Sequence, residues 1–257
     1  HPLCVGSSLV IPSVQDEIEL SDVVLVAGSE LSDADLYNGG RALQFTGKVI
    51  RIDIDAEQMQ RRVIPEISLH GDSLSILTAL AQGLQVSSSN NGPIRAANLR
   101  RSARAGVRQD LLPWIDAMEQ TMPDGTTVAL DSTQLAYAAH TVMAWNTPRS
   151  WLAPFGFGTL GCALPMAIGA AIADSTKSVL AIVGDGGWLF TVAEMAAAVD
   201  EGINIVLVLW DNHGYGQIRE SFDDVHAPRM GVDVSSHDPS AIARGLSLIH
   251  ISEPTRR

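Results

Sequence analysis

Three oxygen donors follow two apolar runs in the second half of the chain. Asp185 comes one glycine after the run Val179–Val183, and Asn212 and Gly214 follow the run that ends at Trp210. A carboxylate, an amide oxygen and a bare backbone carbonyl are hard ligands of the kind that Mg²⁺ takes, and Mg²⁺ commonly completes its shell with phosphate oxygens and water. These residues predict a Mg²⁺ site formed by Asp185, Asn212 and Gly214 that also holds a diphosphate.

Small and polar residues surround these donors. Glycines at 184, 186 and 187 let the backbone approach a ligand, and N–H groups at the start of a helix favour negative charge. Hydrogen-bond donors for the diphosphate are expected from Ser132, Thr133 and Gln134 in a neighbouring turn. A tight turn after a strand explains the same glycines, and Asn suits such turns because it tolerates a left-handed backbone, so that alternative stays open.

These turns need strands to bring them together. Strand-like and helical segments alternate in the second half, which predicts a doubly wound α/β sheet that binds ligands at the carboxyl ends of its parallel strands. The expected strands are 127–130, 151–153, 178–183 and 203–210, and the expected helices are 110–120, 134–143, 162–173, 193–201 and a last one after Gly216.

The first half shows the same alternation. Strands are expected at 22–28 and 48–55, and helices at 33–45 and 72–84, which is a βαβ pattern. Residues 86–109 are polar, turn-rich and arginine-rich, as in a linker. The chain therefore reads as α/β with two doubly wound parallel-sheet domains, 1–85 and 110–246, and both are expected to be truncated.

Composition excludes some classes of function. The 17 Lys and Arg against 29 Asp and Glu give a net charge of −12 with no basic run, which disfavours nucleic acid and anionic membranes as partners. Cys4 and Cys162 have no metal-ligand spacing, which indicates a reduced, cytoplasmic protein. The chain opens at His1 and is expected to be a piece of a longer protein, and residues 247–257 resemble translated sequencing adapter and are expected to be artefactual.

Two blocks resemble enzymes that use thiamine diphosphate. GDG at 184–186 followed by Asp211-Asn212 is similar to that family's signature, in which GDG precedes a pair of asparagines. The segment 148–173, PRSWLAPFGFGTLGCALPMAIGAAIA, resembles the part of acetolactate synthases and 2-oxo acid decarboxylases that grips the aminopyrimidine ring. The resemblance makes Leu160 the wedge between the two rings and the Gly158 carbonyl an acceptor for the exocyclic amine, and it adds Thr159 and Tyr215 to the cofactor site.

The first half resembles the later part of the central domain of these enzymes. Relatives that hold FAD there carry an arginine soon after the strand-end glycine, and Gly28–Asp33 contains none, so FAD is not expected. Asp53 and Asp55 are interpreted as structural carboxylates at a strand end.

The resemblance implies non-oxidative decarboxylation of a 2-oxo acid with thiamine diphosphate and Mg²⁺. The glutamate that activates the cofactor in relatives belongs to an N-terminal domain of the other subunit, so no catalytic residue is assigned within this chain, and Glu194 is interpreted as structural. The chain alone is expected to be inactive, and its parent protein is expected to be a homodimer or homotetramer.

Alternatives remain for the reaction and the substrate. An acetolactate-synthase-type carboligase shares both cofactor blocks, and a non-catalytic dinucleotide-binding module would use the same α/β framework with Asp211 as its acid. Acidic side chains at Glu220, Asp223 and Asp224 favour a cationic tail such as that of 5-guanidino-2-oxopentanoate, or they form a solvated helix face.

Overall fold

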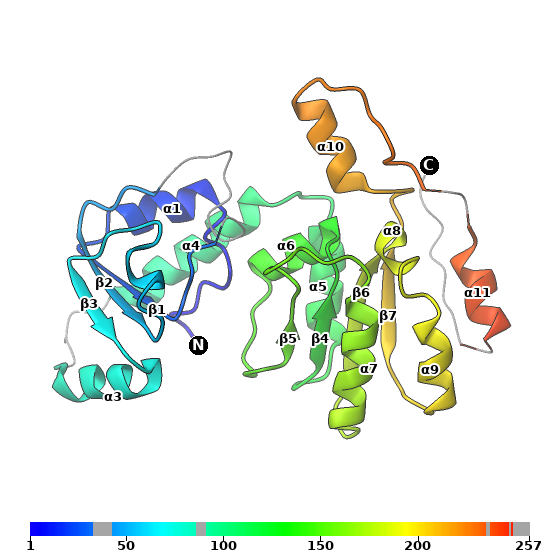
Figure 1. Ribbon diagram of the computed structural model, residues 1–257, viewed down its shortest axis with the longest axis horizontal. Coiled ribbons are helices and arrows are strands. Elements are labelled where there is room, and N and C mark those ends of the chain that lie inside the picture. Colours follow the sequence, from blue (N-terminus) through cyan, green and yellow to red (C-terminus); the bar gives the residue numbers. More distant parts are fainter. Residues whose placement is uncertain (33–42, 86–90, 235–236, 247, 249–257) are drawn as a thin grey trace. The chain divides into compact units, whose positions relative to one another are not determined.

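The chain divides into two compact units. A computed structural model describes residues 1–32, 43–85, 91–234, 237–246 and 248 (Figure 1). Unit 1 contains His1–Pro113 and His140–Ala144, and unit 2 contains Trp114–Ala139 and Trp145–Arg257. Each unit has its own parallel sheet, which confirms the predicted α/β class with two parallel-sheet domains.

Unit 1 has a three-stranded parallel sheet. Its strands are β1 (Val23–Ala27), β2 (Lys48–Asp53) and β3 (Ile67–His70), in the order β1-β2-β3. The strand β3 was not predicted: its sequence ISLH is only four residues long and three of these are exposed, so it forms no apolar run. A 3₁₀ turn, η1 (Gln58–Gln60), precedes it.

The predicted helices of unit 1 have different outcomes. The helix expected at 72–84 is α3 (Ser73–Gly83), and Asp72 is its N-cap, because its carboxylate accepts the Ser75 N–H at 2.9 Å. Most of the helix expected at 33–45 lies outside the described residues.

The predicted linker is wrong over most of its length. Residues 92–106 form the helix α4 (Gly92–Gly106), which packs against the unpredicted helix α1 (Pro12–Glu19). The buried side chain of Ala103 shares a small core with Ile11 and Val14. Arginine and alanine favour helix, and here small residues form the buried face while the arginines remain accessible, so composition alone misread this segment.

Unit 2 contains a four-stranded parallel sheet in the order β5-β4-β6-β7. The bounds are Thr127–Leu130 for β4, Trp151–Leu152 for β5, Val179–Gly184 for β6 and Val206–Trp210 for β7. The two inner strands, β4 and β6, are buried at every position, as their unbroken apolar sequences require.

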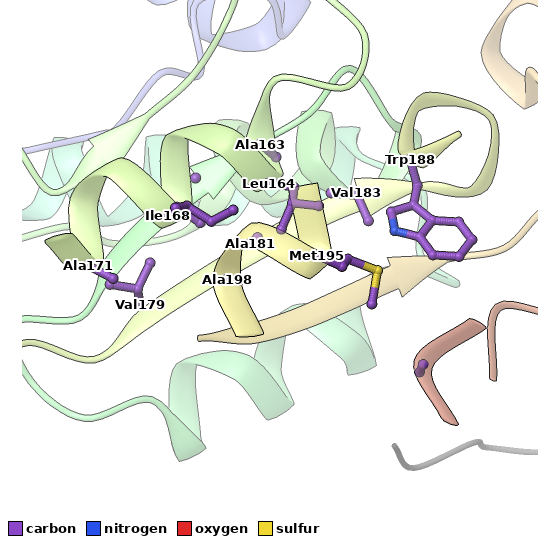
Figure 2. Close-up of a cluster of buried hydrophobic side chains, with 13 residues drawn as sticks. Ala163, Leu164, Ile168, Ala171, Val179, Ala181, Val183, Trp188, Met195 and Ala198 are labelled. Atoms are coloured by element: carbon purple, nitrogen blue, oxygen red, sulfur yellow. The ribbon is translucent and has the colours of Figure 1, made fainter. Parts of the chain in front are cut away.

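The core of unit 2 lies between its sheet and two helices. Helix α7 (Ala163–Ala173) packs on β4 and β6, and it also contacts α9 (Glu194–Asp200). Alanines at 163, 167 and 171 recur at helical spacing on its buried face, so the helix can approach the strands closely. Figure 2 shows this cluster, with Ala171 at one end and the Trp188 ring at the other.

The remaining helices connect and extend this sheet. They are α5 (Leu112–Thr121), α6 (Gln134–Val142), α8 (Asp185–Trp188), α10 (Gly216–Asp224) and α11 (Pro239–Gly245). Helix α11, which was not predicted, contributes Ala243 to the unit 2 core. None of the helices among the described residues is long and apolar enough to cross a membrane.

Candidate functional site

Three turns at one edge of the unit 2 sheet carry most of the predicted site residues. They follow β4, β6 and β7, which run parallel in neighbouring positions, so their carboxyl ends share that edge. In Figure 1 the short helix α8 marks this edge at the end of β6. Hydrogen bonds and side-chain packing join all three turns.

Asp185 is the first residue of α8 and is 2% exposed. Its Oδ2 accepts the backbone N–H of Gly214 at 2.7 Å, which ties the turn after β6 to the turn after β7. Burial raises the pKa of this carboxyl group; the Gly214 N–H opposes that shift, and the negative charge of Asp211 adds to it. A buried carboxylate next to another acid is an electrostatically costly group that a cation would stabilise.

The Asn212 amide meets the same turn. One of its terminal atoms lies 2.7 Å from the Gly214 carbonyl oxygen and 3.2 Å from Oδ1 of Asp185, and the other lies 3.0 Å from Oε1 of Gln134. Two orientations are possible, and the protein groups by themselves favour the nitrogen inward, because an inward oxygen faces only acceptors. With the amide nitrogen inward, it donates to both oxygens; with the amide oxygen inward, three oxygen atoms converge, and Nδ2 donates to Gln134.

The second orientation matches the needs of Mg²⁺. Octahedral Mg²⁺ at 2.0–2.1 Å from its ligands places adjacent oxygens about 2.9 Å apart. The separations of 2.7 and 3.2 Å from Asn212 to Gly214 and to Asp185 bracket that value. The Asn212 amide therefore lies, from each of the other two predicted ligand groups, at a spacing that a single hard cation can bridge.

Two donors next to this cluster lack partners. The Oγ of Ser132 and the Nε2 of Gln134 are buried and have no hydrogen-bond partner among the described residues. Buried polar atoms are rarely left unpaired, because each unsatisfied group costs about 1–3 kcal/mol. Both belong to the predicted diphosphate donors, so the chemistry of the pair fits an anionic group beside the cation.

The glycines of the GDG turn serve packing within the protein. A Cβ at Gly187 would lie 2.5 Å from Oδ2 of Asp131, and one at Gly186 would lie 2.7 Å from the Tyr215 ring. At Gly184 the neighbour is Thr133, at 3.0 Å. Protein side chains thus occupy the space where a Cβ would lie, and the prediction that these glycines also let the backbone approach a phosphate stays a prediction.

The turn before α7 carries Gly158, Thr159 and Leu160. Gly158 has a φ of +61°, and its carbonyl accepts no hydrogen bond from the described residues, which leaves it available to a ligand. Thr159 is exposed, and Leu160 is half-buried. The next residue, Gly161, fastens this turn to the strand ends.

Asp131 and Thr191 hold Gly161 from both sides. The Gly161 N–H lies 2.9 and 3.0 Å from the two carboxylate oxygens of Asp131, and the Thr191 hydroxyl donates to the Gly161 carbonyl at 2.7 Å. Asp131 is fully buried, and burial raises the pKa of its carboxyl group against the opposing N–H bonds of Ser132 and Gly161. No role was predicted for Asp131 from the sequence; a carboxylate directly after a buried strand was the available signal.

Other expected residues have plain structural surroundings. Glu194 is exposed in the first turn of α9, and Asp53 accepts the Asp55 N–H at 3.0 Å; their structural interpretation stays a prediction. Asp223 does not offer an open carboxylate, because Arg229 donates to it at 2.7 and 2.5 Å. Asp211 accepts the His213 N–H at 3.0 Å and so caps the turn.

Comparison with known proteins decides the family. A model described as "Thiamine pyrophosphate enzyme, C-terminal TPP binding domain" matches residues 131–254, and one described as "Thiamine pyrophosphate enzyme, central domain" matches residues 1–80. The chain belongs to the thiamine pyrophosphate enzyme family. Its C-terminal domain is a binding domain for thiamine diphosphate, and the turns described above lie within it.

The family match extends to residue 254 and so includes part of the tail expected to be artefactual. Within that tail only Leu248 lies among the described residues, and it packs against the unit 2 core.

Individual relatives include more than one kind of thiamine pyrophosphate enzyme. "Probable 2-ketoarginine decarboxylase AruI" of Pseudomonas aeruginosa is 34% identical over 95% of this chain and 44% of its own length. The acetolactate synthase isozyme 1 large subunit of Escherichia coli is 26% identical over 86% of the chain and 40% of its own length. Human 2-hydroxyacyl-CoA lyase 2 is 26% identical over 85% and 36%. The chain thus spans less than half the length of these relatives.

Proposed function

We propose that this chain is the cofactor-anchoring part of an enzyme that decarboxylates a 2-oxo acid non-oxidatively, using thiamine diphosphate and Mg²⁺. One observation carries the proposal: the amide of Asn212 lies 2.7 Å from the Gly214 carbonyl oxygen and 3.2 Å from Oδ1 of Asp185, close to the separation of adjacent octahedral Mg²⁺ ligands. Membership in the family supports thiamine diphosphate as the cofactor, and this geometry supports a metal bound by the three groups.

The amides of Asn212 and Gln134 link the cation to the diphosphate. When a cation turns the Asn212 oxygen inward, Nδ2 of Asn212 donates to Oε1 of Gln134 at 3.0 Å. That arrangement leaves Nε2 of Gln134 without a protein partner, together with Oγ of Ser132. Both donors are then available to phosphate oxygens, so the cation and the anion stabilise the same arrangement of the site.

The residues of this chain bind and orient, whereas the cofactor supplies the electron sink for decarboxylation. The Gly158 carbonyl would accept from the aminopyrimidine, and Leu160 would set the bent shape of the cofactor. Asp131 and Thr191 hold that turn through Gly161. The resemblance implies an activating glutamate in an N-terminal domain of the other subunit, so we expect no turnover by the 257-residue chain alone.

Calorimetric titration of the chain tests the anchoring role. We expect thiamine diphosphate to bind in the presence of MgCl₂ and to lose most of its affinity when EDTA removes the metal. Asn212→Ala and Asp185→Asn should each weaken Mg²⁺ binding by at least about 10–100-fold, the range found for outer-shell partners. Asp174→Asn is the matched control, because Asp174 is a half-buried turn carboxylate of the same unit. Metal-independent binding of thiamine diphosphate, or binding of NAD without magnesium, would contradict the proposal.

A guanidino 2-oxo acid is the substrate class that we propose. Support comes from the relative named for 2-ketoarginine, which covers 95% of the chain at 34% identity. One of the three acids expected to meet a cationic tail, Asp223, already binds the guanidinium of Arg229, so its carboxylate is not open to the substrate. Comparing turnover of guanidino and aliphatic 2-oxo acids by the full-length parent tests this choice, and equal rates would exclude it.

The second candidate is an acetolactate-synthase-type carboligase. The match to the acetolactate synthase large subunit of Escherichia coli over 86% of the chain favours it. The two reactions share the anchoring site and differ in the final acceptor, which is a proton in one and a second 2-oxo acid in the other. Product analysis of the parent with pyruvate distinguishes acetaldehyde from acetolactate.

A further inference from the structure

Arg219 makes three contacts around the turn that carries Asn212 and Gly214. Its guanidinium donates to the Asn212 carbonyl at 3.3 Å, to the His213 carbonyl at 2.7 Å and to Oδ1 of Asp233 at 3.0 Å. The side chain comes from α10, seven residues beyond Asn212, and is 22% exposed. One planar group therefore spans both peptide carbonyls that precede Gly214.

The turn itself has an unusual backbone. His213 and Gly214 have φ values of +61° and +135°, in the region that L side chains rarely adopt. The Tyr215 N–H donates to the Val232 carbonyl at 2.8 Å, and the Gly214 N–H donates to Asp185 at 2.7 Å. The Gly214 carbonyl shares a planar trans peptide with the Tyr215 N–H, so the bond to Val232 helps to set its direction, and the two preceding peptides hold the rest of the turn.

We propose that Arg219 is a positioning residue that holds this turn in the form that presents the Gly214 carbonyl and the Asn212 amide to the cation. The guanidinium turns the carbonyls of Asn212 and His213 toward itself. Those two oxygens are thereby occupied. The Gly214 carbonyl accepts the Gly216 N–H at 3.0 Å and keeps a second lone pair, which a metal can use together with the side-chain oxygens. This inference rests on the proposed Mg²⁺ site.

Geometry, rather than charge, is the contribution of Arg219. A guanidinium close to a bound cation repels it, and the Asp233 carboxylate at 3.0 Å offsets that positive charge. A lysine at this position would keep the charge, but its single ammonium group lacks the planar fork that reaches several acceptors at once. If Arg219 acted only through its charge, Arg219→Lys would bind the cation as well as the wild type does. If it acts through its geometry, Arg219→Lys binds the cation more weakly.

Titration of the chain with MnCl₂ at saturating thiamine diphosphate, followed by electron paramagnetic resonance, tests this inference. Arg219→Ala and Arg219→Lys should both raise the Kd for Mn²⁺ by about 10–100-fold, the range for outer-shell partners, and should alter the spectrum of bound Mn²⁺. Asp233→Asn should raise the Kd by a smaller factor. It gives an independent measurement should the Arg219 variants fail to fold, as judged by circular dichroism.

Arg229→Ala is the matched control. Arg229 donates to Asp223 at 2.7 and 2.5 Å, and Asp223 lies on α10, the helix that carries Arg219. Among the described residues, Arg229 has no hydrogen bond to the turn. Its removal should leave the Kd and the spectrum unchanged. If the wild type binds Mn²⁺ and the Arg219 and Asp233 variants bind it equally well, the inference about Arg219 is wrong while the proposed function stands. Full affinity in Arg219→Lys would also overturn it, and a wild-type chain that binds no Mn²⁺ would remove the proposed function and the inference together.

Discussion

The thiol of Cys162 sits close to the candidate site and is chemically suppressed. Burial, followed by the charge of Asp131, raises its pKa to about 11 from the ordinary 9.0. The thiol also donates to the Thr159 carbonyl at 3.3 Å. Because the thiolate is the nucleophile, it should react with iodoacetamide at pH 8 roughly 100-fold more slowly than a thiol of ordinary pKa. Mass spectrometry of timed samples measures this rate.

Cys4 provides the internal comparison, since it is a free and exposed thiol in unit 1. A Cys4→Ser variant isolates the slow reaction. Alkylation of Cys162 as fast as that of Cys4 in the folded chain would show that the thiol is open and ionised.

Single residues differ in how well sequence reveals them. Asp185 and Asn212 could be predicted because their side-chain chemistry and their position after buried strands point the same way. Arg219 could not, because its role depends on which carbonyls a helix brings within reach. The packing around Gly186 and Gly187 could not be predicted either. A Cβ there would meet the ring of Tyr215 or the carboxylate of Asp131, and both are far away in sequence.

At the scale of elements, Asp131 joins β4 to the turn before α7. Its raised pKa has a defined consequence for stability. Above the unperturbed value of 3.8, the native state retains a proton that the unfolded chain has released, so this group lowers the free energy of unfolding as pH rises toward the native pKa. Asp131→Asn removes that dependence.

Urea unfolding of both proteins without metal, from about pH 4 to 7, measures the effect. The stability of the wild type minus that of Asp131→Asn should decrease as pH rises through this window, and the contributions of other carboxylates cancel in the difference. A difference that stays constant or grows with pH would show that burial does not raise the pKa of the Asp131 carboxyl group in the native state.

Elements were predicted best where burial is uniform. The strands β4 and β6 are buried throughout, and their apolar runs located them within one residue. In contrast, α4 was read as linker because its arginines and the preceding SSSNNGP segment hide the alanines that pack on α1. An amphipathic helix with a face of small residues has a weak hydrophobic pattern, so tertiary packing decides its structure.

At the scale of the whole chain, every residue of the candidate site belongs to unit 2, whereas unit 1 has its own sheet and core. A substitution in the core of unit 1 should therefore lower stability without weakening cofactor binding, whereas one in unit 2 near the site should affect both.

Ile52 in β2 and Ile182 in β6 are matched probes, because both are 0% exposed in inner strands of parallel sheets. Replacing either by alanine should cost about 2–5 kcal/mol in the stability of its own unit. Ile52→Ala should leave the Kd for thiamine diphosphate with Mg²⁺ unchanged, whereas Ile182→Ala, three residues before Asp185, should weaken binding as well. Urea unfolding and calorimetric titration of both variants measure the two effects. Equal losses of affinity would mean that the site depends on unit 1, contrary to the separation of the two cores.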